Sequence, residues 1–202
     1  LLHLDQPILE INITPDRGYA FSYRGVAREY HHSTGAKFVD PVTELNKRAP
    51  AAPAAESGVS SDIEVIVDDN NPIHGVTGCD RYVARAIHGF DPTNHTPNWM
   101  RRRLIRAGMR SISLAVDVTN YVMLDLGQPM HAYDLDKIEG PIVVRRAAEG
   151  EKLTTLDGKE HDLSVEDLLI TDSPDGKRGS RILGIAGVMG GLYGEVTADT
   201  KN

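Results

Sequence analysis

Residues 116–131 read VDVTNYVMLDLGQPMH, and no other part of the chain gathers so many groups able to bind a ligand or move a proton. Two polar residues, Thr119 and Asn120, precede an apolar run, and a rigid step at Pro129 leads to His131. Threonine and asparagine both donate and accept hydrogen bonds, and histidine has an ordinary pKa near neutrality. We therefore expect the rest of the chain to frame this stretch or to supply a further wall of its pocket.

The same stretch also has a purely structural interpretation. Gly127 is a typical helix end, so Asn120 can be the N-cap of a helix over the apolar run. His131 can then be a core histidine that follows a proline turn. On the residues alone, the structural and the functional interpretation both stay open.

The composition is that of an acidic globular protein. Of the 202 residues, 40% are hydrophobic and 25% are charged, so a substantial core can be buried. The formal net charge of −7 opposes binding to a phosphate backbone unless basic residues cluster locally. The single cysteine, Cys79, excludes an internal disulfide and fits a reducing compartment. No stretch reaches membrane-spanning length, and the start has no signal-peptide pattern. Because the first residue is leucine, we expect a piece of a longer protein.

A segment without an apolar period divides the chain. Residues 48–61 are rich in alanine and proline, which is typical of a linker. Before it, residues 1–47 are expected to form a strand over 8–13 and a helix over 22–34. So small a segment can hardly close a core of its own. We expect the main domain to occupy residues 62–202.

Strands outnumber helices in the expected main domain. A helix is predicted after Thr96 and Pro97, a capping hydroxyl and a proline at the first helical position, with its end at Gly108. The dipeptide Asp157-Gly158 favours a two-residue hairpin turn. β-Branched or apolar runs predict strands over residues 63–67, 81–87, 142–146, 168–171 and 182–191. The sequence therefore predicts an α+β fold, with a largely antiparallel sheet or sandwich core, flanking helices and a small N-terminal strand-helix segment.

Several kinds of site are excluded by pattern. The lone cysteine has no CxxC partner, the histidines form no HExxH or clustered ligand set, and no metal site is expected. The chain has no glycine-rich phosphate loop and no Gly-x-Ser-x-Gly nucleophile elbow. A site that uses water without a covalent nucleophile remains, built from Thr119, Asn120 and His131. Backbone N–H groups around Ala186-Gly187 can hold an oxyanion, which suits hydrolysis of an activated ester.

Five sequence words lie in order along nearly the whole chain: TPDRGYAFS…RGVARE, TPNWMRRRLIRAGMRSIS, VDVTNYVMLDLGQPMHAYDLDKI, RRAAEGEKLTTLDG and GIAGVMGG. They resemble the bacterial phenylalanyl-tRNA synthetase β-subunit family. The resemblance implies that residues 62–202 are an editing domain, and that residues 1–47 are the end of a preceding, discontinuous domain.

By this resemblance, the reaction is hydrolysis of tyrosine wrongly esterified to phenylalanine tRNA. A pocket that accepts phenylalanine discriminates imperfectly against its hydroxylated analogue, so a second site must destroy the product. The family's pocket residues correspond to Thr119, Asn120, Pro129, His131, Ala186 and Gly187. Asn120 and His131 would order the attacking water and the terminal ribose, with Thr119 beside the ester. Ala186 and Gly187 would line the slot for the tyrosine side chain.

The resemblance also implies partners. Members of the family are cytoplasmic tetramers of two α and two β subunits, and the α subunit carries out aminoacylation with ATP and magnesium. The partners of this chain would be the α subunit and the 3′ end of the tRNA that carries tyrosine, with no cofactor or metal in the chain itself. A glutamate that reads the tyrosine hydroxyl in the family is expected just after Asn202, and Glu195 does not match it.

Two other functions stay open. The acidic charge and the weak catalytic signature also fit a non-catalytic scaffold or an RNA- or subunit-interaction module of the same synthetase. A third interpretation is RNA binding through Arg101–Arg106, because Trp99, Arg103 and Arg106 fall near one stripe of the predicted helix. The alternative for that helix is an amphipathic element that buries Trp99, Leu104 and Ala107 and leaves its arginines in water.

Overall fold

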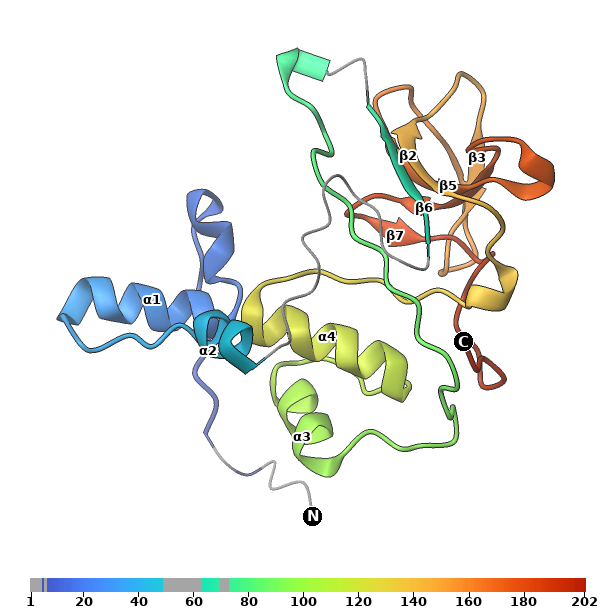
Figure 1. Cartoon of the computed structure of the whole chain (residues 1–202). Helices are drawn as coiled ribbons and strands as arrows, with labels where there is room; N and C mark the ends of the chain where they lie inside the picture. The colour runs from blue at the N-terminus through green and yellow to red at the C-terminus, as the bar shows by residue number, and fades with distance from the viewer. Residues whose placement is uncertain (1–4, 6, 49–62, 70–72) are drawn as a thin grey trace. The chain divides into compact units, whose positions relative to one another are not determined.

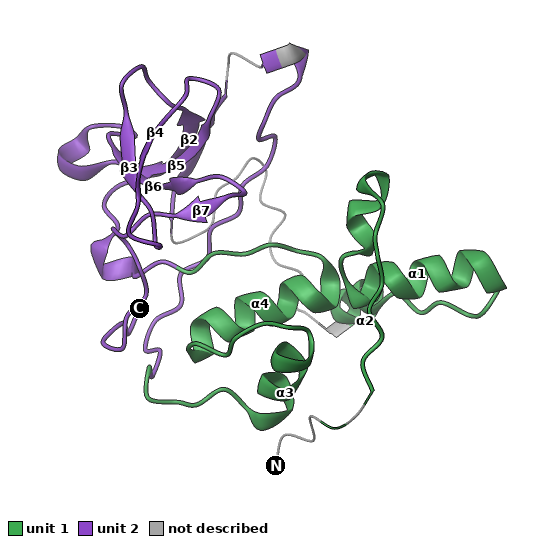
Figure 2. Ribbon diagram, turned by 180° about the vertical axis from the view of Figure 1, so that it is seen from behind, with its two compact units in different colours: residues 1–52, 92–132 green, residues 53–91, 133–202 purple. Residues whose placement is uncertain are grey.

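The computed structural model describes residues 5, 7–48, 63–69 and 73–202. The expected linker over residues 48–61 therefore lies outside the described residues, except for Arg48. The chain forms two compact units, each built from two stretches of sequence (Figure 2): residues 1–52 with 92–132, and residues 53–91 with 133–202. The domain boundaries expected from the sequence, 1–47 and 62–202, remain a prediction.

The first unit is helical in its described residues (Figure 1). Its elements are a 3-10 helix η1 at Pro15–Ala20 and the α-helices α1 Tyr23–Thr34, α2 Pro41–Arg48, α3 Asn98–Arg106 and α4 Leu114–Leu126. The prediction of α1 is confirmed at both ends. The Ser22 hydroxyl accepts a hydrogen bond from the Gly25 N–H at 3.0 Å, and Gly35 ends the helix in the left-handed conformation at a φ of 73°.

Gly25 sets how closely α1 approaches η1. It is buried in the first turn of α1, and a Cβ atom there would lie 1.9 Å from the carbonyl oxygen of Tyr19. Only glycine allows this approach without a shift of the backbone.

The predicted strand over residues 8–13 is wrong. These residues have no regular structure, and Leu9 is 82% exposed. An alternating pattern fits a strand only where a neighbouring strand accepts its hydrogen bonds, and the described part of this helical unit offers none. The small N-terminal segment is therefore helical rather than strand-helix.

The second unit is built on a five-stranded sheet with the order β1-β2-β5-β6-β7. Its strands are β1 Val65–Asp68, β2 Ile142–Arg146, β5 Leu168–Asp172, β6 Arg181–Ile185 and β7 Met189–Gly190. Strand β1 runs parallel to β2, and every other pair in this sheet is antiparallel. A separate hairpin joins β3 Lys152–Thr154 to β4 Glu160–Asp162. Short 3-10 helices lie between strands: η3 Ile73–Gly75, η4 Leu135–Lys137 and η5 Pro174–Gly176. The predicted α+β fold with a largely antiparallel sheet is confirmed.

The core of the second unit lies where the central strands meet. Val143 and Val144 of β2, Leu169 of β5 and Leu183 of β6 are almost fully buried. These strands come from the apolar runs that predicted them, and β2 has the predicted bounds.

Residues 81–87 form no strand, contrary to the prediction. The alternation is real, because Ala84 is buried in a cluster with Val65 and Ile142 while Val83 and Ile87 are exposed. The segment has no ladder of hydrogen bonds, so it packs one face against the sheet as irregular chain. Alternation reports which side is buried and not whether the backbone is paired.

The predicted hairpin turn and the last predicted strand need correction. The hairpin around Asp157-Gly158 exists, but Thr155 N–H donates to the Lys159 carbonyl at 2.9 Å, which leaves a three-residue loop instead of two. The run over 182–191 is not one strand. It folds back between β6 and β7, with residues 186–188 as the turn.

A buried ion pair ties the end of β1 to β2. The Asp69 carboxylate accepts from Arg146 Nε at 2.8 Å and from the Gly78 N–H at 2.5 Å, and its side chain is fully buried. The hydrogen bond from Arg146 holds the pKa of Asp69 below its ordinary value despite burial, which acts in the opposite direction.

Acid is therefore expected to weaken the second unit. Because the folded-state pKa of Asp69 lies below the unfolded value, its contribution is complete above about pH 4 and is lost as the pH falls toward the folded value. Amide hydrogen exchange of β1 and β2 measures the free energy of opening these strands. As the pH falls from 5 to below the folded-state pKa of Asp69, we expect this free energy to fall by about 1.5–3 kcal/mol, the range for hydrogen bonds to a charged group. Asp69→Asn should remove most of that pH dependence. An unchanged dependence in this variant would assign the acid sensitivity to other carboxylates.

Within the described residues, no helix is long and apolar enough to cross a membrane.

Candidate functional site

Helix α4 carries the first two predicted site residues. It begins after Ser113, whose hydroxyl accepts from Val116 N–H, and ends at Gly127 in the left-handed conformation at a φ of 78°. The predicted helix end at Gly127 is confirmed. Asn120 lies in the middle of the helix, so the interpretation of this residue as an N-cap is wrong.

A buried carboxylate fixes the first turn of α4. Asp117 is fully buried and accepts three hydrogen bonds: from the Thr96 hydroxyl at 2.5 Å, the Ser111 hydroxyl at 2.5 Å and the Ile112 N–H at 2.9 Å. The Asp117 side chain thereby holds together the segment that precedes α3 and the segment that precedes α4. Thr96 is thus engaged with Asp117 and makes no side-chain cap for α3, contrary to the prediction.

Thr119 and Asn120 follow Asp117 by two and three residues on this anchored helix. The Thr119 hydroxyl donates to the Val116 carbonyl at 2.8 Å, which leaves its oxygen able to accept a further hydrogen bond. Asn120 is half-buried, and its side-chain amide makes no hydrogen bond within the described chain. Asn120 therefore offers both a donor and an acceptor on a rigid element.

His131 lies four residues beyond Gly127. Its side chain is exposed, as is Pro129 before it. Desolvation by the surrounding chain still lowers the pKa of His131 from its ordinary value. This shift favours the neutral imidazole, which is the state that can accept a proton from water. The alternative of a core histidine is wrong, because the side chain is not enclosed.

Ala186 and Gly187 lie in the turn between β6 and β7. Gly187 is exposed and has a φ of 71°, a conformation that favours glycine. The Ala186 N–H donates to the Leu168 carbonyl at 2.8 Å. The expectation that both N–H groups face a ligand is therefore wrong for Ala186, whose N–H is used within the sheet.

The predicted site residues divide between the two units. Thr119, Asn120, Pro129 and His131 belong to the helical unit, and Ala186 and Gly187 belong to the sheet unit. Sequence reasoning missed Asp117, which holds α4 in place. An aspartate in the first turn of a helix was a weak signal for it.

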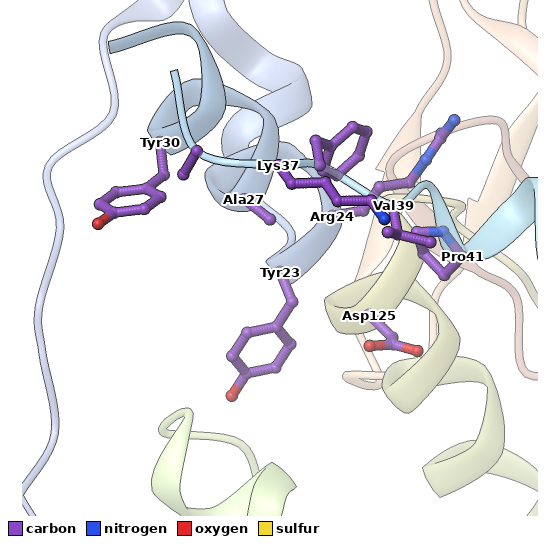
Figure 3. Close-up of a pocket in the computed structure, with 10 residues that line it drawn as sticks. Tyr23, Arg24, Ala27, Tyr30, Lys37, Val39, Pro41 and Asp125 are labelled. Atoms are coloured by element: carbon purple, nitrogen blue, oxygen red, sulfur yellow. The ribbon is translucent and has the colours of Figure 1, made fainter. Parts of the chain in front are cut away.

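One cavity in the described part of the chain lies away from these residues. It has a volume of about 380 Å³ and lies in the helical unit, between α1, the chain that follows it and one residue of α4 (Figure 3). Its lining residues are Tyr23, Arg24, Ala27, Tyr30, Ala36, Lys37, Phe38, Val39, Pro41 and Asp125. None of the predicted site residues is among them. Asn120 on α4 and His131 after its end therefore remain the predicted site residues.

No cluster of three or more histidine, cysteine or carboxylate side chains that could hold a metal ion occurs in the described part of the chain.

Comparison with known proteins defines the class first. A family model described as the B3/4 domain matches residues 78–202, well over half of the chain. The chain belongs to the B3/4 domain family.

Its relatives make the assignment more specific. The chain is 81% identical, over all 202 residues, to the phenylalanine–tRNA ligase beta subunit of Bifidobacterium longum (strain NCC 2705), and covers 23% of that protein. It is 52% identical over its whole length to the beta subunit of Leifsonia xyli subsp. xyli (strain CTCB07), of which it covers 22%. The resemblance stated from the sequence words is confirmed. The chain spans less than a quarter of the length of these relatives.

Among solved structures, an N-terminal fragment of the phenylalanyl-tRNA synthetase beta subunit from Pyrococcus horikoshii matches 44% of this chain and 31% of its own, with 22% identity and a TM-score of 0.37. At that TM-score the match adds nothing to the fold described above.

Proposed function

We propose that this chain carries the editing site of a phenylalanine–tRNA ligase β subunit and hydrolyses tyrosine esterified to phenylalanine tRNA. The observation that carries the proposal is the 81% identity over the full chain to such a subunit. The geometry of α4 supports it, because Asn120 lies unengaged on a helix that Asp117 anchors.

The chemistry assigned to the site is attack by water on an ester. The water oxygen adds to the ester carbonyl carbon, the bond to the ribose oxygen breaks, and that oxygen takes up a proton. Neutral His131 orders the water or accepts its proton, and Asn120 holds the water or the ribose by hydrogen bonds. The Thr119 oxygen would accept a hydrogen bond from the amino group of the esterified amino acid. Pro129, Ala186 and Gly187 remain predicted substrate contacts.

The partners follow from the same proposal. We expect the chain to act within a complex of two α and two β subunits in the cytoplasm, on the 3′ end of tRNA. Aminoacylation with ATP and magnesium is assigned to the α subunit. No described residue of this chain is proposed to hold either one.

One observation favours the alternative of a non-catalytic scaffold. The Thr119 hydroxyl and the Ala186 N–H both donate to carbonyls of the chain itself. A scaffold needs neither group to meet a substrate, so the two functions predict different results for the same variants.

Release of tyrosine from mischarged tRNA in the whole enzyme separates them. We expect His131→Ala to slow release about 10²-fold, the lower end for loss of a general base, and Asn120→Ala to slow it about tenfold. Charging with phenylalanine should stay unchanged. His161→Ala is the matched control, because His161 is an exposed histidine of β4 outside the site. Unchanged release in both site variants would favour the scaffold.

A further inference from the structure

Helix α3 concentrates positive charge on an acidic protein. Its nine residues, NWMRRRLIR, include four arginines and no acidic residue, while the whole chain has a formal net charge of −7. Met100 and Leu104 are buried and fix which side of the helix faces the core. Trp99, Arg102 and Arg103 lie away from that side at helical spacing.

An exposed tryptophan lies at the centre of this side. Trp99 is 49% exposed, although a large aromatic side chain is usually well buried. Its ring meets that of Tyr121 on α4 edge to face, with centroids 5.2 Å apart. The predicted amphipathic alternative is therefore correct for Leu104, which is buried, and wrong for Trp99 and Ala107, which are exposed. Trp99 keeps surface that a partner can contact.

Arg103 joins the two aromatic rings. Its guanidinium lies 5.7 Å from the centroid of Trp99 and 5.7 Å from that of Tyr121, and Nη1 donates to the Tyr121 hydroxyl. The guanidinium of this exposed residue is thus held in place by rings and retains further N–H donors. Such a planar, oriented cation suits both phosphate oxygens and base edges.

The charge on this side is not neutralised from within. Neither Arg102 nor Arg103 makes an ion pair with a carboxylate in the part of the chain that the structure describes. By contrast, Arg24, Arg145 and Arg181 all pair with carboxylates in this structure. A partner with negative charge is therefore the natural complement of α3.

We infer that Trp99, Arg102, Arg103 and Tyr121, here called the α3 face, bind an unpaired stretch of RNA. Trp99 stacks on a base, and the two guanidinium groups contact the flanking phosphates. Proteins that bind single strands combine these same two features, a basic surface and an aromatic platform.

The position of the α3 face connects it with the proposed function. Tyr121 lies directly after Thr119 and Asn120 on α4, and α3 packs against α4, as both views of the ribbon show (Figures 1 and 2). The inference rests on the proposed function only for the identity of the RNA, which would be the tRNA being edited. Binding is measured separately from hydrolysis, so one can fail without the other.

The test uses the whole enzyme and uncharged phenylalanine tRNA, with affinity measured over a range of salt concentrations. We expect Arg102→Gln/Arg103→Gln to weaken binding about 10²-fold, the lower end for loss of two charge-assisted hydrogen bonds. The slope of log affinity against log salt should fall by roughly 0.7 for each phosphate that the variant no longer neutralises. Trp99→Ala should weaken binding about fivefold or more with little change in that slope, because stacking involves no counterion release.

The matched control is Arg81→Gln/Arg85→Gln, which removes the same charge at two exposed arginines of the other unit. If both double variants bind tRNA equally, general charge accounts for the effect and the α3 face is excluded. If the α3 double variant binds tRNA normally but no longer assembles with the α subunit, the face is a protein interface and the inference is overturned. If Trp99→Ala does not fold, the comparison of the two double arginine variants still tests whether the α3 face binds RNA. Release of tyrosine by His131→Ala is a separate result that does not bear on this binding.

Discussion

Replacing Asp117 by alanine is expected to lower the free energy of unfolding of the helical unit by about 3–5 kcal/mol. The carboxylate accepts three hydrogen bonds, from two hydroxyls and one N–H, in a fully buried position. Its removal leaves the Thr96 and Ser111 hydroxyls and the Ile112 N–H without their acceptor. Because these donors lie in the chain before α3 and before α4, the variant should also loosen the start of α4.

Urea unfolding of the chain, followed by tryptophan fluorescence, measures this effect. The chain has a single tryptophan, Trp99, and that residue lies on α3 against α4, so the signal reports the helical unit alone. Asp117→Asn should cost less, because the hydroxyls can turn and accept from the new amide. Asp16→Ala, at an exposed aspartate of the same unit, should stay within about 0.5 kcal/mol. Equal midpoints for Asp117→Ala and Asp16→Ala would contradict the anchoring role.

The elements that the sequence predicted correctly depend on local signals. Helix α1 has a serine at its N-cap and a glycine in the left-handed conformation at its end, and α4 ends at Gly127 in the same way. Strand β2 is a short β-branched run that is buried, and it has the predicted bounds. In each case the residues that fix the element lie inside it or next to it.

The incorrect predictions concern features that depend on distant partners. Residues 8–13 and 81–87 both alternate, but neither finds a neighbouring strand to complete its hydrogen bonds. The Thr96-Pro97 pattern placed the start of α3 one residue too early, because Pro97 is the N-cap and Asn98 the first helical residue. It also gave the role of Thr96 incorrectly, since its hydroxyl is engaged by Asp117. The identity of the side chain that meets Thr96, twenty-one residues later, is not contained in the local pattern.

In the candidate site, too, local features were predictable from the sequence and features that depend on distant residues were not. The choice of Asn120 and His131 depended on residue types and a family resemblance, and the structure adds their surroundings: a helix interior and an exposed segment. The role of Asp117 required three hydrogen bonds from two other segments, which only the fold brings together. The basic, aromatic side of α3 was visible as a stripe, but the exposure of Trp99 and its packing against Tyr121 were not.

Removal of the Asp172 carboxylate should destabilise the sheet unit as much as Asp117→Ala destabilises the helical one. Asp172 ends β5 directly opposite Arg181 at the start of β6, and its side chain is fully buried. It accepts from Arg181 Nε at 2.9 Å, from Arg181 Nη2 and from the Glu139 N–H at 2.9 Å. Asp172→Ala is expected to cost about 3–5 kcal/mol, because it leaves a mostly buried guanidinium without its main partner. Amide hydrogen exchange of β5 and β6 measures the loss locally.

The double variant Asp172→Ala/Arg181→Ala distinguishes the unpaired charge from the missing packing. If the penalty comes from the unpaired guanidinium, the double variant should be less destabilised than the sum of the two single variants by more than about 1 kcal/mol. The Tyr193 ring, whose centroid lies 3.9 Å from the Arg181 guanidinium, has no cation to pack on in the double variant, so full recovery is not expected. Asp162→Ala removes the exposed partner of Lys152 and should cost less than about 1 kcal/mol. Additive penalties for Asp172 and Arg181 would show that each side chain stabilises the sheet independently, since a coupled buried pair cannot give additive values.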